Sequence, residues 1–499
     1  MHGRETKHPI LFEINVRPWL TELSARCGKS LTFSDIPDLE LDRIERLGID
    51  FVWLMGVWET GPQGTEIARS HPGLLQEYRR ALPDLTLDDV VGSPYAIARY
   101  VVSSRFGGPI GLADLRRRLA DRGIKLILDF VVNHTGVDFP WVRERPELYV
   151  QGTQDDLQRS PQDFFSVEAI SGTRILAHGK DPYFPGWTDT AQLNLLHPAT
   201  REALRSILIE IANQCDGVRC DMAMLALQSV FRGTWGDHLA GYPQSSEELW
   251  TELVGTGRAQ RPHFRFIAEV YWGLEGEVRS LGLDYTYDKT LYDGLVENNA
   301  ERLRQHLGTD CIVQQCSVRF LENHDEPRAA AVFPLDRHRA SAVVASTLPG
   351  MLLVHEGQIE GRRIRLPIQL RRRPVEPVEP EIQRFYERLL ATLHDPVFRQ
   401  GVWRLLPIRP AWEANSTWER FLAWEWSLGS RLCWVVVNLG STQGQCYLSV
   451  SNAAMRGREF DLRDLLGKAH YQRNGSDLLD KGLYLDLPAF GFHAFAIEI

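Results

Sequence analysis

The sequence of 499 residues contains no run of about 18 or more apolar residues, the length that a helix needs to cross a lipid bilayer. No apolar signal core precedes the first strand-like segment, which begins at Ile10. Basic charge is not in excess, because 56 Lys and Arg residues face 65 Asp and Glu residues and the formal net charge is −9. We therefore expect a cytoplasmic protein that binds neither a membrane nor nucleic acid, since phosphate backbones require a basic surface.

Closely spaced cysteine pairs are also missing. The seven cysteines are odd in number and scattered through apolar segments, without the spacing of a zinc site or a disulfide framework. We expect buried free thiols at Cys27, Cys215, Cys220, Cys311, Cys316, Cys433 and Cys446. No Gly-x-Gly-x-x-Gly turn follows an early strand-like segment, which argues against a nicotinamide-dependent enzyme.

Short apolar segments alternate with longer amphipathic ones over the first 395 residues. The strand candidates are Leu11–Val16, Phe51–Leu54, Lys125–Phe130, Gly217–Asp221, Phe264–Glu269, Tyr285–Tyr287, Ser317–Leu321 and Met351–Val354. The helix candidates are Leu39–Leu47, Gly111–Arg122, Thr200–Gln214, Ser246–Gly255, Arg302–Leu307 and Arg337–Ser346. This alternation predicts an α/β fold with a (β/α)₈ TIM barrel over residues 1–395. A doubly wound open sheet is the alternative that the pattern leaves open.

Two connections are too long for plain turns between a strand and its helix. They cover residues 58–106 and 134–197, and we expect both at the C-terminal face of the barrel, where barrel enzymes place their sites. The second predicts an insertion domain after strand 3. Residues 400–499 consist of short β-rich runs separated by Gly, Ser and Asn, which predicts a C-terminal antiparallel β-sandwich.

Four carboxylates stand at or just beyond the ends of predicted barrel strands: Asp129, Asp221, Glu269 and Asp325. Any one of them alone is explained as well by a structural ion pair or a cap. In a barrel, however, the carboxyl ends of the strands meet at one face, so the four side chains converge on one cavity. Cleavage of a glycosidic bond needs such a set, because one carboxylic acid protonates the leaving oxygen while an opposed carboxylate attacks or screens the sugar carbon.

Arg219 precedes Asp221 by two residues on the same predicted strand, so the two side chains point to the same face. A fixed guanidinium group there is expected to orient the carboxylate and to lower its pKa. The acid of the pair must instead keep its proton near neutral pH. A partly apolar site with neighbouring carboxylates can arrange this.

These residues stand in four segments, Asp129-Phe-Val-Val-Asn-His134, Gly217-Val-Arg-Cys-Asp221, Ala268-Glu-Val270 and Glu322-Asn-His-Asp325. The segments resemble the four signature regions of the α-amylase superfamily, glycoside hydrolase family 13, and they occur in the family's order. The resemblance covers essentially the whole chain. It implies the family's fold, a catalytic (β/α)₈ barrel with an insertion domain after the third strand and a C-terminal β-sandwich.

The resemblance also implies a role for each residue of the motifs. Asp221 would be the nucleophile, Glu269 the general acid/base, and Asp325 a third carboxylate that binds sugar hydroxyls and stabilises the transition state. The substrate-binding residues implied in the same way are Tyr95, Asp129, His134, Arg219 and His324. Tyr95 lies in Ser93-Pro-Tyr-Ala-Ile97, which resembles the segment whose tyrosine stacks under the sugar, and packing in the core is the alternative for this residue.

The sequence departs from the family where many amylases carry a Lys-His pair after the nucleophile. Here Asp221 is followed by Met222-Ala-Met-Leu225. The usual acceptor contacts, and the histidine that gives calcium a backbone ligand, are therefore in doubt. Asn133 is a candidate calcium ligand, with a strand-end cap as the alternative. We expect no cofactor for the chemistry and, at most, a structural calcium ion.

Two further groups of residues bear on specificity. One is a set of arginines in the loop after the eighth strand: Arg362, Arg363, Arg365, Arg371, Arg372 and Arg373. They either pair with nearby glutamates (Glu356, Glu360, Glu376 and Glu379) or form a seat for an anionic sugar end such as a phosphate. The other is a set of aromatic residues in the insertion, which form either stacking platforms for glucose rings or a small local core: Phe164, Phe165, Tyr183, Phe184 and Trp187.

Together these observations predict an α-retaining glycoside hydrolase or transglycosylase that acts on α-glucans or malto-oligosaccharides through a covalent glycosyl-aspartate intermediate. No sequence feature separates a hydrolase from a 4-α-glucanotransferase or predicts the oligomeric state. Isomerases and phosphorylases acting on trehalose, sucrose or maltosyl phosphate stay open within the same superfamily. The alternative of a different class is a non-catalytic carbohydrate-binding or partner protein of the same fold. Such proteins usually lack one or more of the carboxylates, and this chain keeps all of them.

Overall fold

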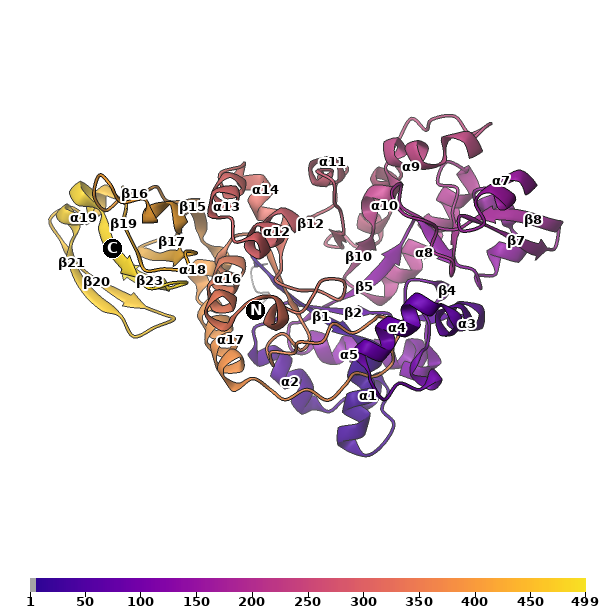
Figure 1. Cartoon of the computed structure of the whole chain (residues 1–499), viewed down its shortest axis with the longest axis horizontal. Coiled ribbons are helices and arrows are strands. Elements are labelled where there is room, and N and C mark those ends of the chain that lie inside the picture. Colours follow the sequence, from indigo (N-terminus) through magenta and orange to yellow (C-terminus); the bar gives the residue numbers. More distant parts are fainter. Residues whose placement is uncertain (1–5) are drawn as a thin grey trace.

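A computed structural model describes residues 6–499, in which eight parallel strands close into a barrel (Figure 1). The strands are β1 (Ile10–Asn15), β2 (Phe51–Met55), β5 (Lys125–Val131), β10 (Gly217–Asp221), β11 (Arg265–Ala268), β12 (Tyr285–Tyr287), β13 (Ser317–Arg319) and β14 (Met351–His355). They stand side by side in sequence order, and β1 pairs with both β2 and β14. The predicted TIM barrel is therefore confirmed, and the doubly wound open sheet is wrong.

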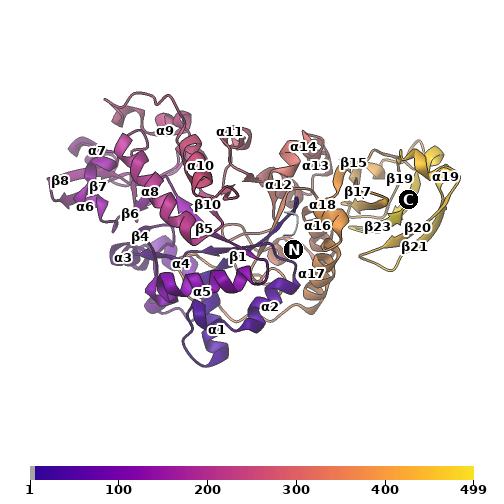
Figure 2. The ribbon, with the colours of Figure 1, turned by 180° about the vertical axis from the view of Figure 1, so that it is seen from behind.

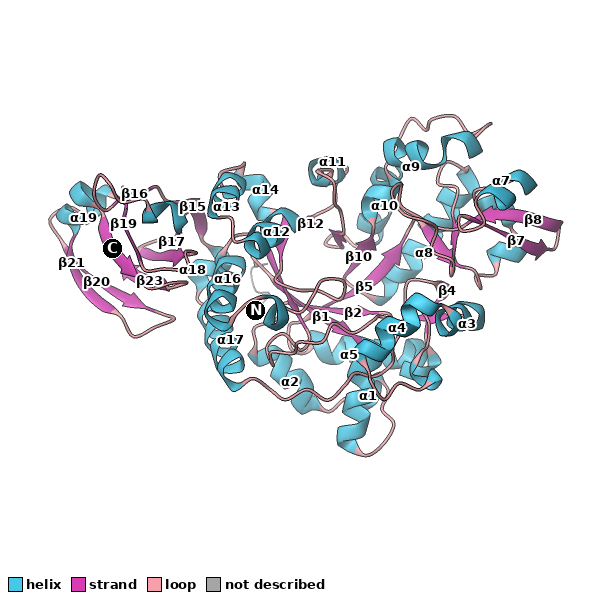
Figure 3. Cartoon of the chain, in the orientation of Figure 1, coloured by secondary structure: helices cyan, strands magenta, loops and turns pink. Residues whose placement is uncertain are grey.

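Helices surround the barrel and cover the outward faces of its strands (Figure 3). The helices that follow strands include α1 (Val16–Cys27), α2 (Asp38–Arg46), α5 (Gly108–Ala120), α8 (Pro198–Gln214), α10 (Leu249–Gln260), α11 (Glu275–Ser280), α12 (Lys289–Glu297), α13 (Ala300–Leu307), α16 (Leu335–Thr347) and α17 (Pro380–Leu393). In α5, Leu112, Leu115 and Leu119 are buried at helical spacing, so one apolar stripe holds the helix against the barrel. Beyond this helix Gly123 adopts a φ of 74°, a conformation that glycine reaches at little cost.

The two long connections carry structure of their own. Residues 58–106 form β3 (Trp58–Thr60), α3 (Pro62–Ser70), α4 (Pro72–Ala81) and β4 (Ile97–Val102). Residues 134–197 form β6 (His134–Gly136), α6 (Trp141–Glu144), α7 (Gln154–Arg159), β7 (Phe164–Ala169), β8 (Gly172–Ala177) and β9 (Thr190–Gln192). Figures 1 and 2 show β7 and β8 at one end of the molecule and the C-terminal strands at the other. The insertion after the third barrel strand is thus confirmed as part of the fold.

The C-terminal part is antiparallel, as predicted. A six-stranded sheet contains β15 (Val402–Leu405), β17 (Phe421–Leu428), β18 (Arg431–Asn438), β20 (Glu459–Asp464), β21 (His470–Asn474) and β23 (Phe492–Glu498). A three-stranded sheet contains β16 (Ile408–Pro410), β19 (Gly444–Leu448) and β22 (Leu483–Leu487). Buried side chains from both sheets, among them Phe421, Trp434 and Leu485, form a core separate from that of the barrel.

Two tryptophans of β17 fix this sandwich to the barrel. The indole nitrogens of Trp424 and Trp426 both donate to the carbonyl oxygen of Thr347, the last residue of α16, at 3.0 and 2.7 Å. Directly after α12, the Nδ2 group of Asn298 donates to the carbonyl oxygen of Leu439 at 3.1 Å. The sandwich therefore covers one flank of the barrel, beside α16 in both views (Figures 1 and 2).

All seven cysteines are free, as expected, but their burial is not uniform. Cys215, Cys220, Cys433 and Cys446 are buried. Cys27 and Cys311 are exposed and Cys316 is half-buried, so the prediction of burial is wrong for these three. None of the helices within residues 6–499 is long and apolar enough to cross a membrane. Residues 1–5, on which part of the prediction about a signal segment rests, lie outside the described residues.

Candidate active site

Two carboxylates meet at the C-terminal ends of neighbouring barrel strands. Asp221 is the last residue of β10, and Glu269 follows directly after β11. The two strands pair in parallel, with Cys220 opposite Ala268, so the residues that follow lie side by side. Both carboxylates are largely removed from water, with 6% of Asp221 and 4% of Glu269 exposed. A buried carboxylate needs a partner, and these two share one.

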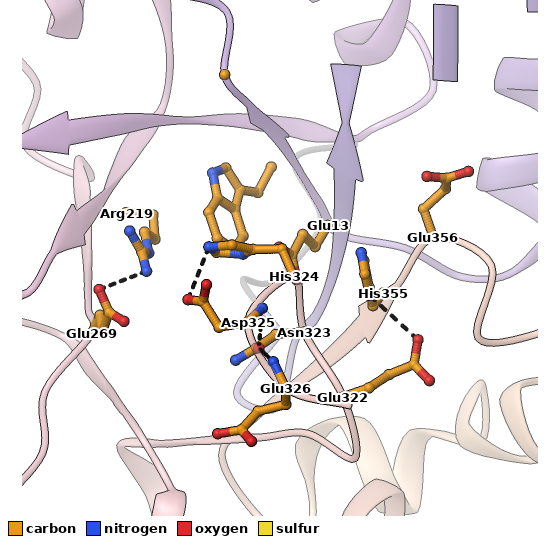
Figure 4. A network of polar contacts seen from close by, with 12 residues as sticks. Glu13, Arg219, Glu269, Glu322, Asn323, His324, Asp325, Glu326, His355 and Glu356 are labelled. Atoms are coloured by element: carbon orange, nitrogen blue, oxygen red, sulfur yellow. Dashed lines mark hydrogen bonds and ion pairs between the residues drawn. The ribbon is translucent and has the colours of Figure 1, made fainter. Parts of the chain in front are cut away.

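The shared partner is the guanidinium group of Arg219, which is fully buried. Its Nη1 lies 2.5 Å from Oδ1 of Asp221, and its Nη2 lies 2.7 Å from Oε2 of Glu269 (Figure 4 shows the second contact). The rings of Trp53, Tyr95 and Tyr287 surround the guanidinium carbon at 5.1, 5.3 and 5.7 Å. This aromatic cage fixes the cation, which in turn fixes the distance between the two carboxylates.

Two further donors orient Glu269. The backbone nitrogen of Met222 donates to Oε2 at 2.8 Å, and the hydroxyl group of Tyr271 donates to Oε1 at 2.9 Å. Met222 adopts a φ of 41°, a left-handed conformation that few side chains take up, directly after Asp221. Burial, with the negative charges of Asp221 and Asp325, raises the pKa of Glu269 to about 7 against the opposing charge of Arg219. This carboxyl group can therefore hold a proton near neutral pH.

The pKa of Asp221 contradicts one expectation. We expected the guanidinium group of Arg219 to lower it below its ordinary value. Burial raises the pKa of Asp221, and Arg219 opposes this effect without overcoming it. Desolvation of this buried carboxylate, together with the negative charge of Asp325, outweighs the contact with Arg219 at 2.5 Å.

The third carboxylate forms a chain of contacts with a histidine. Asp325 is about half exposed, with 48% of its side chain accessible, and its Oδ2 lies 3.1 Å from Nε2 of His324 (Figure 4). The other ring nitrogen, Nδ1, lies 2.5 Å from Oε1 of Glu13, a buried residue of β1. Burial lowers the pKa of His324, but the charges of Asp325 and Glu13 outweigh it and raise the pKa well above 6.5. Desolvation raises the pKa of Asp325, and the imidazolium overcomes this and lowers it to about 2.

A buried network holds the loop that carries these residues. Glu322 contacts Nη1 of Arg328 at 2.5 Å and Nδ1 of His355 at 3.3 Å (Figure 4 shows the second contact). The side-chain oxygen of Asn323 accepts from the backbone nitrogens of Asp325 and Glu326, both at 2.9 Å. The loop after β13 is therefore fixed to the end of β14, and Asp325 is aimed toward the other two carboxylates.

Asp129 and Tyr95 complete the cluster. Asp129 accepts from the indole nitrogen of Trp53 at 3.0 Å and from the backbone nitrogen of Gly56 at 2.9 Å. Burial raises its pKa to about 6, although the charge of Arg219 opposes this. The hydroxyl group of Tyr95 lies 3.0 Å from Nε2 of His324, and the two rings stack with centroids 5.6 Å apart. Tyr95 is half-buried and faces the cluster, so packing alone does not account for its position.

His134 lies at the edge of the cluster. It is the first residue of β6 and is buried, and its ring packs against that of Trp187 with centroids 5.2 Å apart. Burial lowers its pKa to about 4, so the imidazole is neutral near pH 7 and can both donate and accept a hydrogen bond. The structure thus brings the predicted nucleophile, acid and third carboxylate together, with the predicted substrate-binding residues around them.

Some aromatic residues of the insertion form a small local core, and others are exposed, as stacking platforms for glucose rings would be. Phe164 is buried, Phe165 stacks on His178 at 4.5 Å, and Trp187 packs on His134, as in a local core. Tyr183 and Phe184 are instead 69% and 67% exposed. Tyr183 meets the half-exposed ring of Trp272 at 5.1 Å, and Trp272 follows Glu269 by three residues.

The surroundings of Asn133 do not resemble a calcium site. Its side-chain oxygen accepts from Nε2 of Gln192 at 3.0 Å, and its amide nitrogen lies 3.4 Å from Nδ1 of His134. Nowhere between residues 6 and 499 do three or more His, Cys, Asp or Glu side chains gather as a metal site would require. The prediction of a calcium ion at Asn133 stays a prediction.

Each arginine of the loop after β14 lies within 4 Å of a carboxylate. The pairs are Arg362–Glu22, Arg363–Glu379, Arg365–Glu77, Arg371–Asp89, Arg372–Asp84, Arg372–Asp89 and Arg373–Glu356. Only Glu356 and Glu379 belong to the partners that we predicted from the same stretch. The paired loop is therefore the better interpretation, and Arg365 alone reaches the cluster, by donating to the carbonyl oxygen of Asp325 at 3.2 Å.

Four residues that contact these side chains were not predicted from the sequence, and one of them is Tyr287 at the end of β12, whose hydroxyl group lies 3.4 Å from Nε of Arg219. Glu13 lies on β1, where a single acidic residue within an apolar strand was the available signal. Tyr271 stands two residues after Glu269, and Trp53 stands in the middle of β2. Both of these aromatic residues belong to apolar runs that a packed core explains equally well, so only the fold identifies their polar contacts.

Comparison with known proteins finds α-amylases among the similar sequences and structures. Residues 38–223 match the model described as "Alpha amylase, catalytic domain". Alpha-amylase 3 of Dictyoglomus thermophilum is 22% identical over 390 residues, which cover 74% of this chain and 67% of that protein. Alpha-amylase MalA of Haloarcula japonica is 25% identical over 367 residues, covering 71% of this chain and 44% of that protein. In fold, the maltogenic alpha-amylase AmyB from Thermotoga neapolitana is similar, with a TM-score of 0.69 and 19% identity over 99% of both chains.

Proposed function

We propose that this chain, which is similar to α-amylases in its catalytic segment and in its fold, is a retaining glycoside hydrolase or transglycosylase acting on α-glucans or malto-oligosaccharides. The observation that carries this proposal is the single guanidinium group of Arg219 between Asp221 and Glu269. Contact with neighbouring nitrogens of one group keeps the two carboxylates close together, as the short separation of a retaining pair requires. The raised pKa of Glu269, about 7, suits it to act first as an acid and then as a base.

In the first half of the proposed reaction, a carboxylate oxygen of Asp221 attacks the anomeric carbon of the sugar. The bond from that carbon to the leaving oxygen breaks, and Glu269 transfers its proton to this oxygen. A β-glycosyl ester of Asp221 results. In the second half, Glu269 takes a proton from water or from a sugar hydroxyl, whose oxygen displaces Asp221. Two inversions at the same carbon restore the α configuration.

The remaining residues bind and orient the sugar in this proposal. Asp325 and His324 face the sugar hydroxyls, and the imidazolium keeps Asp325 ionised, in line with its pKa of about 2. Tyr95 supplies a ring for stacking and also shields Arg219 from water. His134, neutral at pH 7, offers a hydrogen bond to a hydroxyl group at the edge of the site.

Hydrolysis and transfer would use the same residues and would differ in whether water or a sugar accepts the glycosyl group. The residues beside the acceptor therefore bear on the choice between the two reactions. The segment after Asp221 carries buried apolar residues, Ala223 to Ala226, where many relatives carry a Lys-His pair. Isomerases and phosphorylases acting on trehalose, sucrose or maltosyl phosphate would need the same carboxylates. A non-catalytic protein would not require Glu269 to have a pKa near 7 or two donors to orient it, and we favour an enzyme for that reason.

Product analysis tests the proposal. Purified protein is incubated with maltoheptaose, and the oligosaccharides are separated by chromatography beside the variants Asp221→Asn and Glu269→Gln. We expect shorter chains from a hydrolase, or both shorter and longer chains from a transferase, and neither from the variants. Asp237→Asn, on an exposed turn outside the cluster, is the matched control and should behave as the wild type. An unchanged maltoheptaose would contradict α-1,4-glucan activity and leave trehalose, sucrose and maltosyl phosphate as the next substrates.

A further inference from the structure

A cavity of about 950 Å³ lies beside the barrel, and none of the three catalytic candidates lines it. Its walls come from α1, from the segment of β3 and α3, and from the 3₁₀ turn η3 (Ser104–Phe106). The floor is buried and includes Arg17, Leu20 and Trp58, which are 7%, 4% and 1% exposed. The rim is open to solvent and rich in hydroxyl groups, among them those of Thr21 and Ser30. A volume of this size suits a small ligand.

Arg17, on the floor, has no negative partner. Its Nη1 donates to the carbonyl oxygens of Gly92 at 2.5 Å and of Ile368 at 3.4 Å, and its Nη2 donates to Oγ1 of Thr60 at 3.3 Å. All three acceptors are neutral. Among residues 6–499, no carboxylate forms an ion pair with this guanidinium group. A buried charge without a counter-charge is costly, so one that persists beside a cavity calls for an anion.

A second arginine adds to the positive charge. Arg105 lines the same cavity at its exposed rim, and within the described part of the chain its side chain makes no ion pair. Burial, together with the charge of Arg105, lowers the pKa of Arg17 to about 10, so the two cations repel one another. A ligand that carries negative charge between them would remove this repulsion.

The acidic residues of the lining do not neutralise the floor. Glu59 is paired with Arg99 at 2.6 Å. Glu66 and Asp88 lie at the exposed rim, and neither shifts the pKa of Arg17. Carboxylates and hydroxyl groups at a rim are suitable partners for the hydroxyl groups of a sugar. The lining therefore combines the buried cation Arg17 on the floor with hydroxyl groups, carboxylates and the further arginines Arg69, Arg105 and Arg371 around it.

We propose that this cavity is a second ligand site, which binds a small phosphorylated sugar with its phosphate between Arg17 and Arg105. Guanidinium groups match phosphate geometry through paired hydrogen bonds. The sugar then lies toward the rim, against Thr21, Glu66 and Asp88. This is the anionic chemistry that the arginines at 362–373 suggested, but those arginines have carboxylate partners, whereas Arg17 has none.

Calorimetric titration of the full chain with glucose 6-phosphate, inorganic phosphate and glucose tests the site without any turnover. We expect glucose 6-phosphate to bind more tightly than inorganic phosphate, and glucose to give no detectable heat. Arg105→Gln should weaken glucose 6-phosphate binding by about tenfold or more, since a hydrogen-bonded charge contact is lost. Arg105 is exposed, so this variant should fold. Arg80→Gln, on the exposed face of α4 and outside the cavity, is the matched control and should bind as the wild type.

A second variant, Arg17→Lys, keeps the buried charge but removes the paired N–H donors of the guanidinium group. We expect this variant to bind glucose 6-phosphate more weakly than the wild type does, and its affinity for inorganic phosphate to fall by a smaller factor. The proposal is overturned if glucose 6-phosphate does not bind, or if glucose binds as tightly. It is overturned as well if Arg105→Gln binds glucose 6-phosphate like the wild type. These outcomes are independent of the maltoheptaose assay, because activity at Asp221 and binding at Arg17 are measured separately.

Discussion

Oε1 of Glu13 lies 2.5 Å from Nδ1 of His324, although 311 positions separate the two residues in the chain. Asp325 and the hydroxyl group of Tyr95 contact the other ring nitrogen. Glu13 and Asp325 together raise the pKa of His324 well above 6.5, so the imidazole is protonated near neutral pH. The charged ring then links the barrel core, through β1, to Asp325, the third carboxylate of the cluster.

Glu13→Gln removes the negative charge behind His324, so the pKa of the imidazole should fall. We expect kcat/KM to drop by about tenfold. We also expect kcat/KM to begin its fall with rising pH at a lower pH than in the wild type, because a neutral imidazole no longer holds Asp325 in place. The measurement is the pH profile of kcat/KM. Glu45→Gln, an exposed substitution on α2, serves as the control. A Glu13→Gln profile that overlays the wild-type curve would show that Glu13 has no such positioning role.

The pKa of Glu269 predicts the alkaline side of the same profile. The first step requires the protonated acid, so kcat/KM should fall as the pH rises through about 7, with the slope of a single proton. Glu269→Gln should have almost no activity on maltoheptaose. With a glucosyl fluoride, whose leaving group needs no proton, the variant should form the ester without this alkaline decline. Wild-type activity that stays constant up to pH 9 would be inconsistent with a pKa near 7.

Exposed aromatic rings beside Glu269 predict a binding surface for the sugar chain. Tyr183 of the insertion and Trp272 meet at 5.1 Å and leave large faces accessible. Trp272→Ala should raise KM for maltoheptaose by about three- to tenfold with little change in kcat, because a stacking face is lost and the catalytic carboxylates are untouched. Trp412→Ala, whose ring is 55% exposed in the C-terminal part, should leave KM unchanged. An unaltered KM in the first variant would mean that the sugar chain leaves the site in another direction.

The hydrogen bonds that Trp424 and Trp426 of the sandwich donate to Thr347 of the barrel are expected to stabilise the fold. In Trp426→Phe the hydrogen bond to the Thr347 carbonyl disappears, while Trp424 still donates to the same oxygen. We expect the free energy of unfolding to fall by about 1 kcal/mol, as measured by urea denaturation. The double variant with Trp424→Phe should lose more than the sum of the two single losses, because the buried carbonyl is then left without a donor. Strict additivity would argue that the shared oxygen is unimportant.

The barrel was predictable because its strands are buried on both faces and therefore read as short apolar runs. β2, with the sequence Phe-Val-Trp-Leu-Met, and β10 are buried throughout and coincide closely with the predicted segments. The carboxylates could be predicted for a related reason, since Asp221 and Glu269 interrupt such runs at strand ends. Their polarity conflicts with local burial, and that conflict marks a functional site.

Contacts between distant segments could not be predicted in the same way. The pairing of Glu13 with His324 and the unpaired charge of Arg17 depend on barrel closure, which brings β1 beside β14. The direction of the pKa shift at Asp221 depends on how far the site excludes water, and a strand pattern does not give that quantity. The exposure of Cys27 follows from its place at the last residue of α1, although the sequence around it suggested burial.

The stereochemistry of the first product tests the central claim most directly. Proton NMR follows the anomeric signals from the earliest times after wild-type protein meets maltoheptaose, or whichever substrate the product analysis identifies. We predict that the α anomer appears first and converts slowly to the β anomer in solution, and that Asp221→Asn releases neither. Release of the β anomer first would contradict a glycosyl–Asp221 intermediate and the roles assigned to both Asp221 and Glu269.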